Sequence, residues 1–362
     1  MKKYPVYEPS LGAEERELLL AAYDSGWISS KGSMILEFEE KFSEFVGANS
    51  TTCANGTVAL HLALAALDIG PGDEVIIPSL TYIATANAVR YCGAEPVFVD
   101  SDLSDWNISA EAIEKAITEK TKAVLVVHLY GALCNMDAIK EVCKKNSVFL
   151  VEDCAEAFGS YLSGRHVGTL GDISTFSFFG NKSITTGEGG MVVSPSSDLI
   201  DRVRKLKNQG LSSHKEYWHD VIGFNYRMTN LQAAIGIGQL GKAAEILARK
   251  KIIFEEYVKE LGDIVMFQKF RDDSVSSHWM VVGLIDITKS VQELRNQLGH
   301  QGVETRPVFP LINEMPPYIG NAVGNLQNAS FISRQGINLP SSAKLSVEDV
   351  RYISGLVKNA LL

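Results

Sequence analysis

Residues 123–127 read Ala-Val-Leu-Val-Val, an apolar run with no polar side chain at alternate positions. A strand of this kind is covered on both faces, which is typical of a parallel sheet with helices on either side. Three similar runs lie within residues 50–200, at 75–77, 96–99 and 148–151, and helix-like segments alternate with them. The sequence therefore predicts an α/β fold with a mostly parallel central sheet flanked by helices.

The pattern changes after about residue 240. A charged helix is expected over residues 242–261, and a strand over residues 303–309 follows further along the chain. We therefore expect a large domain at residues 1–240 and a smaller C-terminal α+β domain at residues 241–362, which closes over the first.

The composition argues against several classes of function. The chain has 362 residues and a net charge of −9, which does not favour a general nucleic-acid or anionic-membrane surface. No run of about 18 apolar residues and no secretory signal is present in the sequence, so we expect a cytoplasmic protein. The five cysteines are scattered without the spacing that zinc requires, so we expect reduced core thiols and no metal site.

Polar residues follow each of the predicted parallel strands. They occupy residues 78–82, 100–102, 128–131 and 152–153. Ligands of open α/β sheets bind outside the carboxyl ends of the strands. These four segments are therefore expected to converge on one binding site.

Asn55, Gly56 and Thr57 open a predicted buried helix over residues 55–67. Free N–H groups at a helix start, next to a glycine without a side chain, can bind an anion such as a phosphate, and Thr57 adds a hydroxyl. Ordinary N-capping is the alternative interpretation of the same residues.

Asp153 follows the buried strand at residues 148–151. A carboxylate in that place needs a cationic partner to offset its desolvation, and a protonated pyridine nitrogen is one such partner. An N-cap or a structural ion pair would explain it equally well. Glu156, three residues further on, would face the same site if a helical turn follows.

Residues 177–190 read Ser-Phe-Phe-Gly-Asn-Lys-Ser-Ile-Thr-Thr-Gly-Glu-Gly-Gly, at the end of a strand expected over residues 173–179. Lys182 would then lie at the mouth of the sheet, where a tightly held amine can act as a nucleophile. A solvated surface lysine is the alternative. Taken with the helix start, Asp153, and the aromatic Tyr82 after another strand, this lysine completes the set of groups that pyridoxal phosphate requires.

Competing motifs are missing from the sequence. No G-x-x-x-x-G-K-[ST] occurs, and residues 187–190 neither match G-x-G-x-x-G nor open a predicted helix. Neither a G-x-S-x-G elbow nor H-E-x-x-H is found. Nucleotide hydrolysis and dinucleotide binding therefore have little support.

Six segments carry a resemblance that runs nearly end to end. They are residues 27–32 (Trp-Ile-Ser-Ser-Lys-Gly), 55–62 (Asn-Gly-Thr-Val-Ala-Leu-His-Leu), 78–84 (Pro-Ser-Leu-Thr-Tyr-Ile-Ala), 151–157 (Val-Glu-Asp-Cys-Ala-Glu-Ala), 177–190 and 223–228 (Gly-Phe-Asn-Tyr-Arg-Met). In these segments the chain resembles the DegT-type family of sugar-nucleotide aminotransferases, which are fold-type I pyridoxal-phosphate enzymes.

The resemblance implies a role for each matching residue. Lys182 would hold the cofactor as a Schiff base and then shuttle the proton, and Asp153 would hold the pyridinium nitrogen. The other implied roles are Glu156 near the ring oxygen, Tyr82 on the ring face, Gly56, Thr57 and Ser177 on the phosphate, Asn225 reaching the phosphate from the neighbouring subunit, and Trp27, Ser29 and Arg306 on the sugar-nucleotide side. The role of Asn225 implies a homodimer with shared active sites.

The resemblance also implies the substrates. L-Glutamate would donate the amino group and leave as 2-oxoglutarate. Residues 179–182, 217–220 and 304–309 favour C4 of GDP-4-keto-6-deoxy-D-mannose as the acceptor. The same transfer to a UDP- or dTDP-linked keto sugar is the alternative, and a cofactor-binding regulator without turnover is a third reading. Lys182 stands where some relatives that dehydrate such sugars carry histidine, which favours amino transfer.

Overall fold

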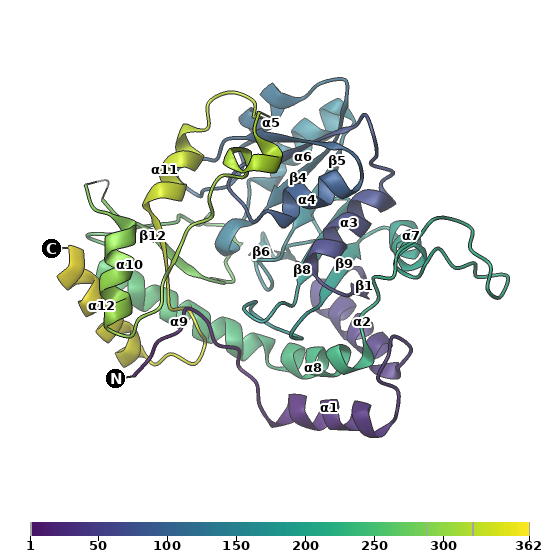
Figure 1. Ribbon diagram of the computed structural model, residues 1–362, viewed down its shortest axis with the longest axis horizontal. Coiled ribbons are helices and arrows are strands. Elements are labelled where there is room, and N and C mark those ends of the chain that lie inside the picture. The colour runs from purple at the N-terminus through teal and green to yellow at the C-terminus, as the bar shows by residue number, and fades with distance from the viewer. Residues whose placement is uncertain (1, 287, 321, 362) are drawn as a thin grey trace.

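The computed structural model of the protein describes residues 2–286, 288–320 and 322–361. Its first sheet has seven strands in the order β1-β9-β8-β5-β4-β2-β3 (Figure 1). The strands are β1 Asn49–Cys53, β9 Gly190–Ser194, β8 Ile173–Ser177, β5 Phe149–Asp153, β4 Thr121–Val127, β2 Glu74–Pro78 and β3 Glu95–Val99. Strand β9 is antiparallel to both of its neighbours, whereas β8, β5, β4, β2 and β3 are parallel. The predicted mostly parallel sheet is confirmed.

Helices cover both faces of this sheet. Val75 and Ile77 of β2 pack on the face that holds α3, α4 and α7, while Ile76 packs on the face that holds α2, α5, α6 and α8. The helices are α2 Ser33–Val46, α3 Gly56–Ala66, α4 Ala84–Tyr91, α5 Ala110–Ala116, α6 Met136–Asn146, α7 Ser197–Lys207 and α8 Asn230–Gly241, with α1 Ala13–Asp24 packed on α8. Each strand is therefore buried on both sides, as its apolar run predicts.

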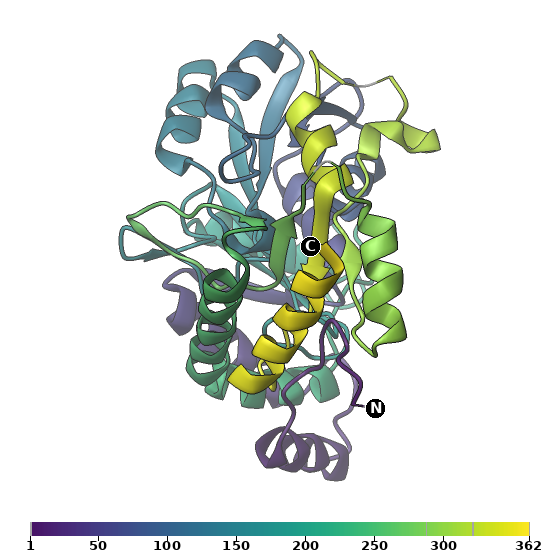
Figure 2. The ribbon, with the colours of Figure 1, turned by 90° about the vertical axis from the view of Figure 1, so that its left-hand side faces the viewer.

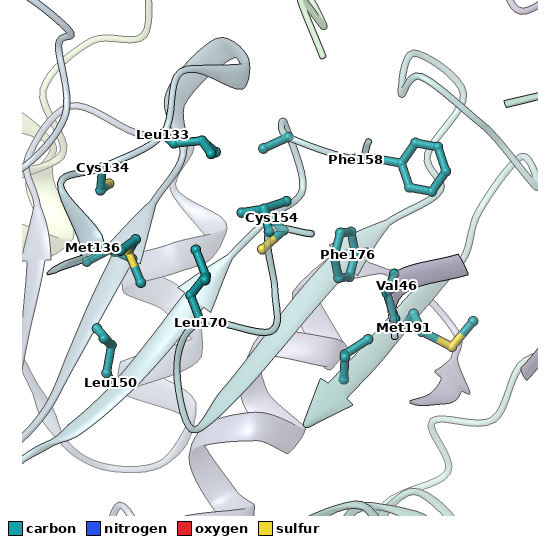
Figure 3. Packing of buried hydrophobic residues seen from close by; sticks show 14 of the residues in the cluster. Val46, Leu133, Cys134, Met136, Leu150, Cys154, Phe158, Leu170, Phe176 and Met191 are labelled. Atoms are coloured by element: carbon teal, nitrogen blue, oxygen red, sulfur yellow. The ribbon is translucent and has the colours of Figure 1, made fainter. Parts of the chain in front are cut away.

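The core on the α2 and α8 face is tightly filled. Phe176 lies between Cys154 and Met191 in Figure 3, with Leu150 further along the same core, and all four side chains are 3% exposed or less. Polar side chains cap the N-termini of helices on both faces of the sheet. Asn55 accepts a hydrogen bond from the backbone N–H of Val58 at 3.0 Å and so begins α3.

A second, antiparallel sheet has the order β10-β12-β14-β13. Its helices α9, α10 and α12 pack around one apolar cluster on its outer face, with α12 in yellow near the viewer in Figure 2. The elements are β10 Met266–Phe267, β12 Val281–Leu284, β14 Gly336–Leu339, β13 Arg306–Pro307, α9 Ala243–Leu261, α10 Val291–His300 and α12 Val347–Leu361. The inner face contributes Val282 and Leu284 to a cluster that also holds Trp279, and Leu129 and Tyr130 from the first sheet's loops. The two sheets therefore meet near the carboxyl ends of the parallel strands.

The strand expected at residues 303–309 is shorter in the structure, where β13 has two residues. Pro307 has no N–H to donate to a ladder, and Val303 pairs instead with Tyr4 from the start of the chain. This pairing, with a hydrogen bond from the N–H of Tyr4 to the carbonyl of Gly302 at 2.8 Å, places the N-terminal segment beside the second sheet.

The remaining elements are short. They are β6 Tyr161–Leu162, β7 Arg165–His166 and β11 Ser274–Val275, which form a third sheet, the 3₁₀ turns η1 Leu129–Gly131, η2 Ile312–Glu314 and η3 Pro316–Tyr318, and the helix α11 Gln327–Gln335. Among the helices of the described residues, none combines the length and the apolar character needed to cross a membrane.

Candidate active site

A cavity of about 710 Å³ lies at the carboxyl ends of the parallel strands, where the second sheet approaches the first. Eight of the eleven residues predicted for the site line it. They are Gly56, Thr57, Tyr82, Asp153, Glu156, Ser177, Lys182 and Arg306. The fold thus brings together residues that are as much as 250 positions apart in the chain, and their individual roles remain predictions.

The N-terminus of α3 forms one end of the cavity. Gly56 lies so close to Ser177 that a Cβ atom added to it would be 2.7 Å from the Ser177 Cβ, which no real pair of side chains tolerates. The Asn55 side chain caps the N–H of Val58, and within the described chain the N–H groups of Gly56 and Thr57 have no recorded acceptor. Two free N–H groups beside a serine hydroxyl suit a phosphate.

Asp153 ends β5 between two parallel neighbours, because the register pairs it with Val127 and Thr175. Its Oδ1 accepts a hydrogen bond from the N–H of Ala155, and its Oδ2 accepts one from Thr85 Oγ1, both at 3.1 Å. Burial raises the pKa of this carboxyl group, and these hydrogen bonds and Lys182 offset only part of the cost. A protonated nitrogen facing Asp153 would restore its charge.

Glu156 lies on the turn that follows β5 and is 4% exposed. Its Oε2 accepts a hydrogen bond from the N–H of Tyr130 at 2.9 Å. Burial raises its pKa to about 7, and the neighbouring Asp153 adds to the rise while Lys182 opposes it. This side chain can therefore hold or release a proton near neutral pH.

Lys182 is fixed at its backbone. Its N–H donates to the carbonyl of Phe179 at 2.9 Å, and its own carbonyl accepts from Tyr7 Oη at 2.6 Å. Its Nζ lies 3.9 Å from the centroid of the Trp279 ring. Burial of the amine lowers its pKa, although Glu156 and Asp153 counteract part of the change. A lowered pKa makes more of the neutral, nucleophilic amine available.

Aromatic rings form the walls of the cavity. The Tyr82 ring lies 5.9 Å from the Phe309 ring and is 58% exposed, so one flat side chain is available to a ligand. Tyr130 stacks between Phe309 and Trp279, with centroid distances of 5.7 and 6.0 Å. Arg306 lies at the start of β13. Its Nη2 contacts Glu304 Oε1 at 3.3 Å, and its side chain is 55% exposed.

Trp27, Ser29 and Asn225 do not line this chain's cavity. The carbonyls of Trp27 and Ser29 accept hydrogen bonds from Asn230 at the start of α8. The loop between α7 and α8 extends away from the rest of the molecule in Figure 1. Asn225 lies where this loop returns to the end of α7, since it pairs with Asn208, and its Oδ1 accepts from Arg227 at 2.5 Å. A single chain therefore assembles the predicted cofactor side more completely than the predicted substrate side.

Sequence reasoning missed Thr85, Tyr130 and Trp279 as site residues. Thr85 lies three positions after Tyr82, at the spacing that brings two side chains to one face of a helical turn, so a signal existed. Tyr130 belongs to residues 128–131, one of the polar segments expected after the strands, but no role was assigned to it. For Trp279 no local signal was available, because it reaches the cavity from beyond the first sheet.

The residues present fit pyridoxal phosphate. The glycine at position 56 leaves room for an anion at the start of α3, and the buried Asp153 has a raised pKa that a cationic ring nitrogen would reverse. Lys182 supplies the amine between them. This fold and this cavity define the class of the pyridoxal-phosphate aminotransferases.

Comparisons with known proteins identify the family. Residues 9–358 match the model of the DegT/DnrJ/EryC1/StrS aminotransferase family. The chain is 52% identical over 354 residues to the GDP-perosamine synthase of Escherichia coli O157:H7, covering 98% of this chain and 97% of that protein. It is 49% identical over 316 residues to the UDP-N-acetyl-3-dehydro-alpha-D-glucosamine 3-aminotransferase of Acidithiobacillus ferrooxidans, covering 87% and 85%. The crystal structure of an aminotransferase from Streptoalloteichus hindustanus superposes with a TM-score of 0.94 at 30% identity, covering 99% and 98%.

The chain therefore belongs to the DegT/DnrJ/EryC1/StrS aminotransferase family. It is an enzyme of that family, and the resemblance expected from the six sequence segments is confirmed.

Proposed function

We propose that this enzyme transfers the amino group of L-glutamate to C4 of GDP-4-keto-6-deoxy-D-mannose, giving GDP-perosamine and 2-oxoglutarate. The observation that carries the proposal is the cavity in which Lys182 lies with Asp153 and the start of α3. The acceptor follows from the 52% identity to a GDP-perosamine synthase over nearly the whole of both chains.

Pyridoxal phosphate supplies, when bound, an aldehyde that takes up the amino group and a ring that withdraws electrons from the carbon being deprotonated. The protein binds and orients it. Gly56, Thr57 and Ser177 would hold the phosphate, and Asp153 would accept a hydrogen bond from the protonated ring nitrogen. The Lys182 amine would then move a proton to and from the carbon that carries the transferred nitrogen.

Arg306 would bind the diphosphate of the sugar nucleotide at the mouth of the cavity. Its exposed guanidinium group can donate two parallel hydrogen bonds to phosphate oxygens, which a lysine cannot do. The aromatic wall of Tyr82 and Phe309 faces the same opening.

We further propose a homodimer in which each site uses both chains. Asn225, Trp27 and Ser29 lie off their own cavity, and Tyr217 and Ile222 on the same loop as Asn225 are 93% and 92% exposed. Exposed apolar side chains of this kind suit burial against a second copy.

The free, mostly buried cysteines suit a reducing cytoplasm.

A panel of keto-sugar nucleotides tests the acceptor. Purified holoenzyme with L-glutamate should aminate GDP-4-keto-6-deoxy-D-mannose with a kcat/KM at least about tenfold above that for UDP- and dTDP-linked 4-keto or 3-keto sugars. Lys182→Ala should be inactive on every substrate. A preference for a UDP-linked sugar would replace the proposed acceptor but retain the reaction, whereas full activity of Lys182→Ala would refute the mechanism.

Mixing two inactive variants tests the shared site. Lys182→Ala and Asn225→Asp should each be inactive alone. Unfolded together and refolded in equal amounts, they should recover about a quarter of wild-type activity, because half of the dimers are mixed and each has one intact site. No recovery from well-folded mixed dimers would mean that Asn225 acts within its own chain, and an active Asn225→Asp variant would mean that Asn225 has no role in the site.

A further inference from the structure

The contacts of Trp279 converge on the loop that carries Lys182. The indole Nε1–H donates to the carbonyl of Asn181 at 2.7 Å, and the face of the same indole lies 3.9 Å from Lys182 Nζ. One side chain thus holds both the backbone before the lysine and the amine at its tip. Trp279 is 4% exposed and lines the cavity.

The position of Trp279 is itself fixed by a buried lysine. Lys250 of α9 donates from Nζ to the carbonyl of Trp279 at 2.9 Å and to that of Ser341 at 3.2 Å. The same Nζ lies 4.7 Å from the ring centroid of Tyr7, whose hydroxyl donates to the carbonyl of Lys182. Lys250 therefore contacts the backbone of Trp279 and the ring of Tyr7, the two residues that hold the loop, and no local signal in the sequence joins them.

We propose that the Trp279 indole face is the resting position of the Lys182 amine whenever that amine is not covalently bound, and that Trp279 is a positioning residue for proton transfer. This inference rests on the proposed role of Lys182 as the proton shuttle. The electron-rich face of an indole attracts the ammonium form of the amine, the form that Lys182 has after it takes up a proton, and it does so more strongly where water is excluded. The amine is thereby kept beside Glu156 and Asp153 instead of turning toward the solvent.

Two substitutions separate the aromatic face from the indole N–H. Trp279→Phe keeps a ring face and loses the hydrogen bond to Asn181, and Trp279→Leu loses both. Trp106→Leu is the matched control, because Trp106 is 1% exposed in the same apolar cluster but does not line the cavity. Loss of the face at a desolvated site corresponds to between about threefold and thirtyfold in the equilibrium that holds the amine.

The first readout is the half-reaction with L-glutamate, followed by the absorbance of the holoenzyme under single-turnover conditions. Trp279→Leu should slow it by about ten- to thirtyfold without weakening the apparent affinity for glutamate, and Trp279→Phe should recover most of the rate. The slowed variant should show a larger kinetic isotope effect with glutamate deuterated at the α carbon, because proton transfer then limits the rate.

The second readout needs neither turnover nor cofactor. Acetylation of Lys182 in the cofactor-free full chain, followed by peptide mass spectrometry, should be several-fold faster in Trp279→Leu, because the amine is less often a cation held on the ring. Fluorinated tryptophan placed at position 279 should increase the labelling rate stepwise with each fluorine, since fluorine weakens the ring face at nearly constant size. This variant keeps the test available if Trp279→Leu fails to fold.

A half-reaction and a Lys182 labelling rate that both match Trp106→Leu, together with no dependence on fluorine, would overturn the proposal. Failure of the proposed function would look different. In that case the wild-type protein would not aminate any sugar nucleotide in the panel, while the labelling differences at Lys182 would persist.

Discussion

At the carboxyl end of β5, Glu152 lies on the face of the sheet that carries Leu150 and Phe176, and its neighbour Asp153 lies on the face that carries α3 and α4. Both side chains are buried, at 0% and 5% exposure, but their environments differ. Glu152 accepts hydrogen bonds from three backbone N–H groups and from His128, whereas Asp153 accepts from one backbone N–H and from Thr85.

The pKa values of the two groups move in opposite directions. Burial alone would raise the pKa of Glu152, but its hydrogen bonds outweigh that effect and hold its pKa below the ordinary value. For Asp153 burial prevails and the pKa rises. A carboxylate whose donors all come from the protein stabilises the fold, and one that still needs a partner is available to a ligand. Strand alternation separates the two roles by a single residue.

This comparison also bears on metal binding. His128, Glu152 and Cys154 lie with their ligand atoms within 4.8 Å of one another, the one such group among the described residues. His128 Nδ1, however, accepts from the N–H of Cys134, and its Nε2 lies 3.1 Å from Glu152. The lone pairs that a metal would need are already engaged, so the group is better explained as a buried hydrogen-bond network.

Asp153→Asn should produce the largest effect. The amide keeps the shape, its oxygen can accept from the N–H of Ala155, and its NH2 group can donate to the Thr85 hydroxyl, but it has no charge to hold a protonated ring nitrogen. We expect kcat to fall by about 10³-fold, or about 4 kcal/mol in the activation barrier, with no loss of thermal stability.

Steady-state kinetics and thermal unfolding of the holoenzyme check this expectation. Asp105→Asn is the control, because burial also raises the pKa of Asp105 but this residue does not line the cavity. A large loss of stability with normal turnover in Asp153→Asn would show that Asp153, like Glu152, is a structural carboxylate.

Glu152→Gln should show the opposite result. An amide nitrogen would face backbone donors at Gly168, or at Leu170 and Gly171, which the carboxylate now satisfies at 2.6 to 3.0 Å. We expect the free energy of unfolding to fall by about 3 kcal/mol, with kcat of the folded fraction within about threefold of wild type.

Urea unfolding measures the loss, and Glu111→Gln on the exposed face of α5 serves as the control, with a change within about 0.5 kcal/mol. If Glu152→Gln were as stable as wild type, the network around Glu152 would not contribute to the fold, and the contrast with Asp153 would fail.

Much of the cavity could be predicted from the sequence because its parts have local signals. Asp153 follows an apolar strand run, Lys182 follows the strand expected over residues 173–179, and Gly56 opens a helix, so the arrangement of the sheet brings them together. The uniformly apolar runs also predicted which strands are buried on both faces. Glu156 was placed at the site by its spacing from Asp153, Ser177 and Arg306 were assigned through the family resemblance, and the structure brings all three to the same cavity.

The rest depended on packing that no local pattern records. Tyr7 reaches Lys182 because Tyr4 pairs with Val303, almost 300 residues away along the chain. Trp279 reaches the cavity from the segment just before β12 of the second sheet. Trp27 and Asn225 do not line the cavity of their own chain, so their roles remain predictions, as does the division of the chain at residues 240 and 241.

Glu156, which lies on the same side of the sheet as Asp153, should make the free energy of unfolding depend on pH. Its pKa is about 7 in the folded chain against an ordinary 4.5, so the native state binds more protons than the unfolded state between these values. Its contribution to stability is fully present below about pH 4.5 and is lost as pH rises through 7. The loss should reach at most about 3 kcal/mol.

The difference in unfolding free energy between cofactor-free wild type and Glu156→Gln, measured from pH 4.5 to 8, isolates this contribution. The difference should change across that window and become constant above it. A difference that is flat with pH would mean that Glu156 is ionised in the folded chain, as Glu152 is.

Thr85→Val should have the smallest effect, because it removes one donor from Asp153 and leaves its charge and position in place. The hydroxyl of Thr85 donates to Asp153 Oδ2 at 3.1 Å and helps to lower the carboxyl pKa, so its loss should raise that pKa further. A net hydrogen bond is worth about 1 kcal/mol, which corresponds to a fall of about fivefold in kcat. Thr121→Val is the control, since Thr121 is also buried and hydrogen-bonded but lies at the start of β4, at the end of the strand away from the cavity. Equal kinetics for the two variants would show that Asp153 is held by its backbone donor alone, whereas a fall confined to Thr85→Val would show that the Thr85 hydroxyl also holds Asp153, in a set of two donors where Glu152 has four.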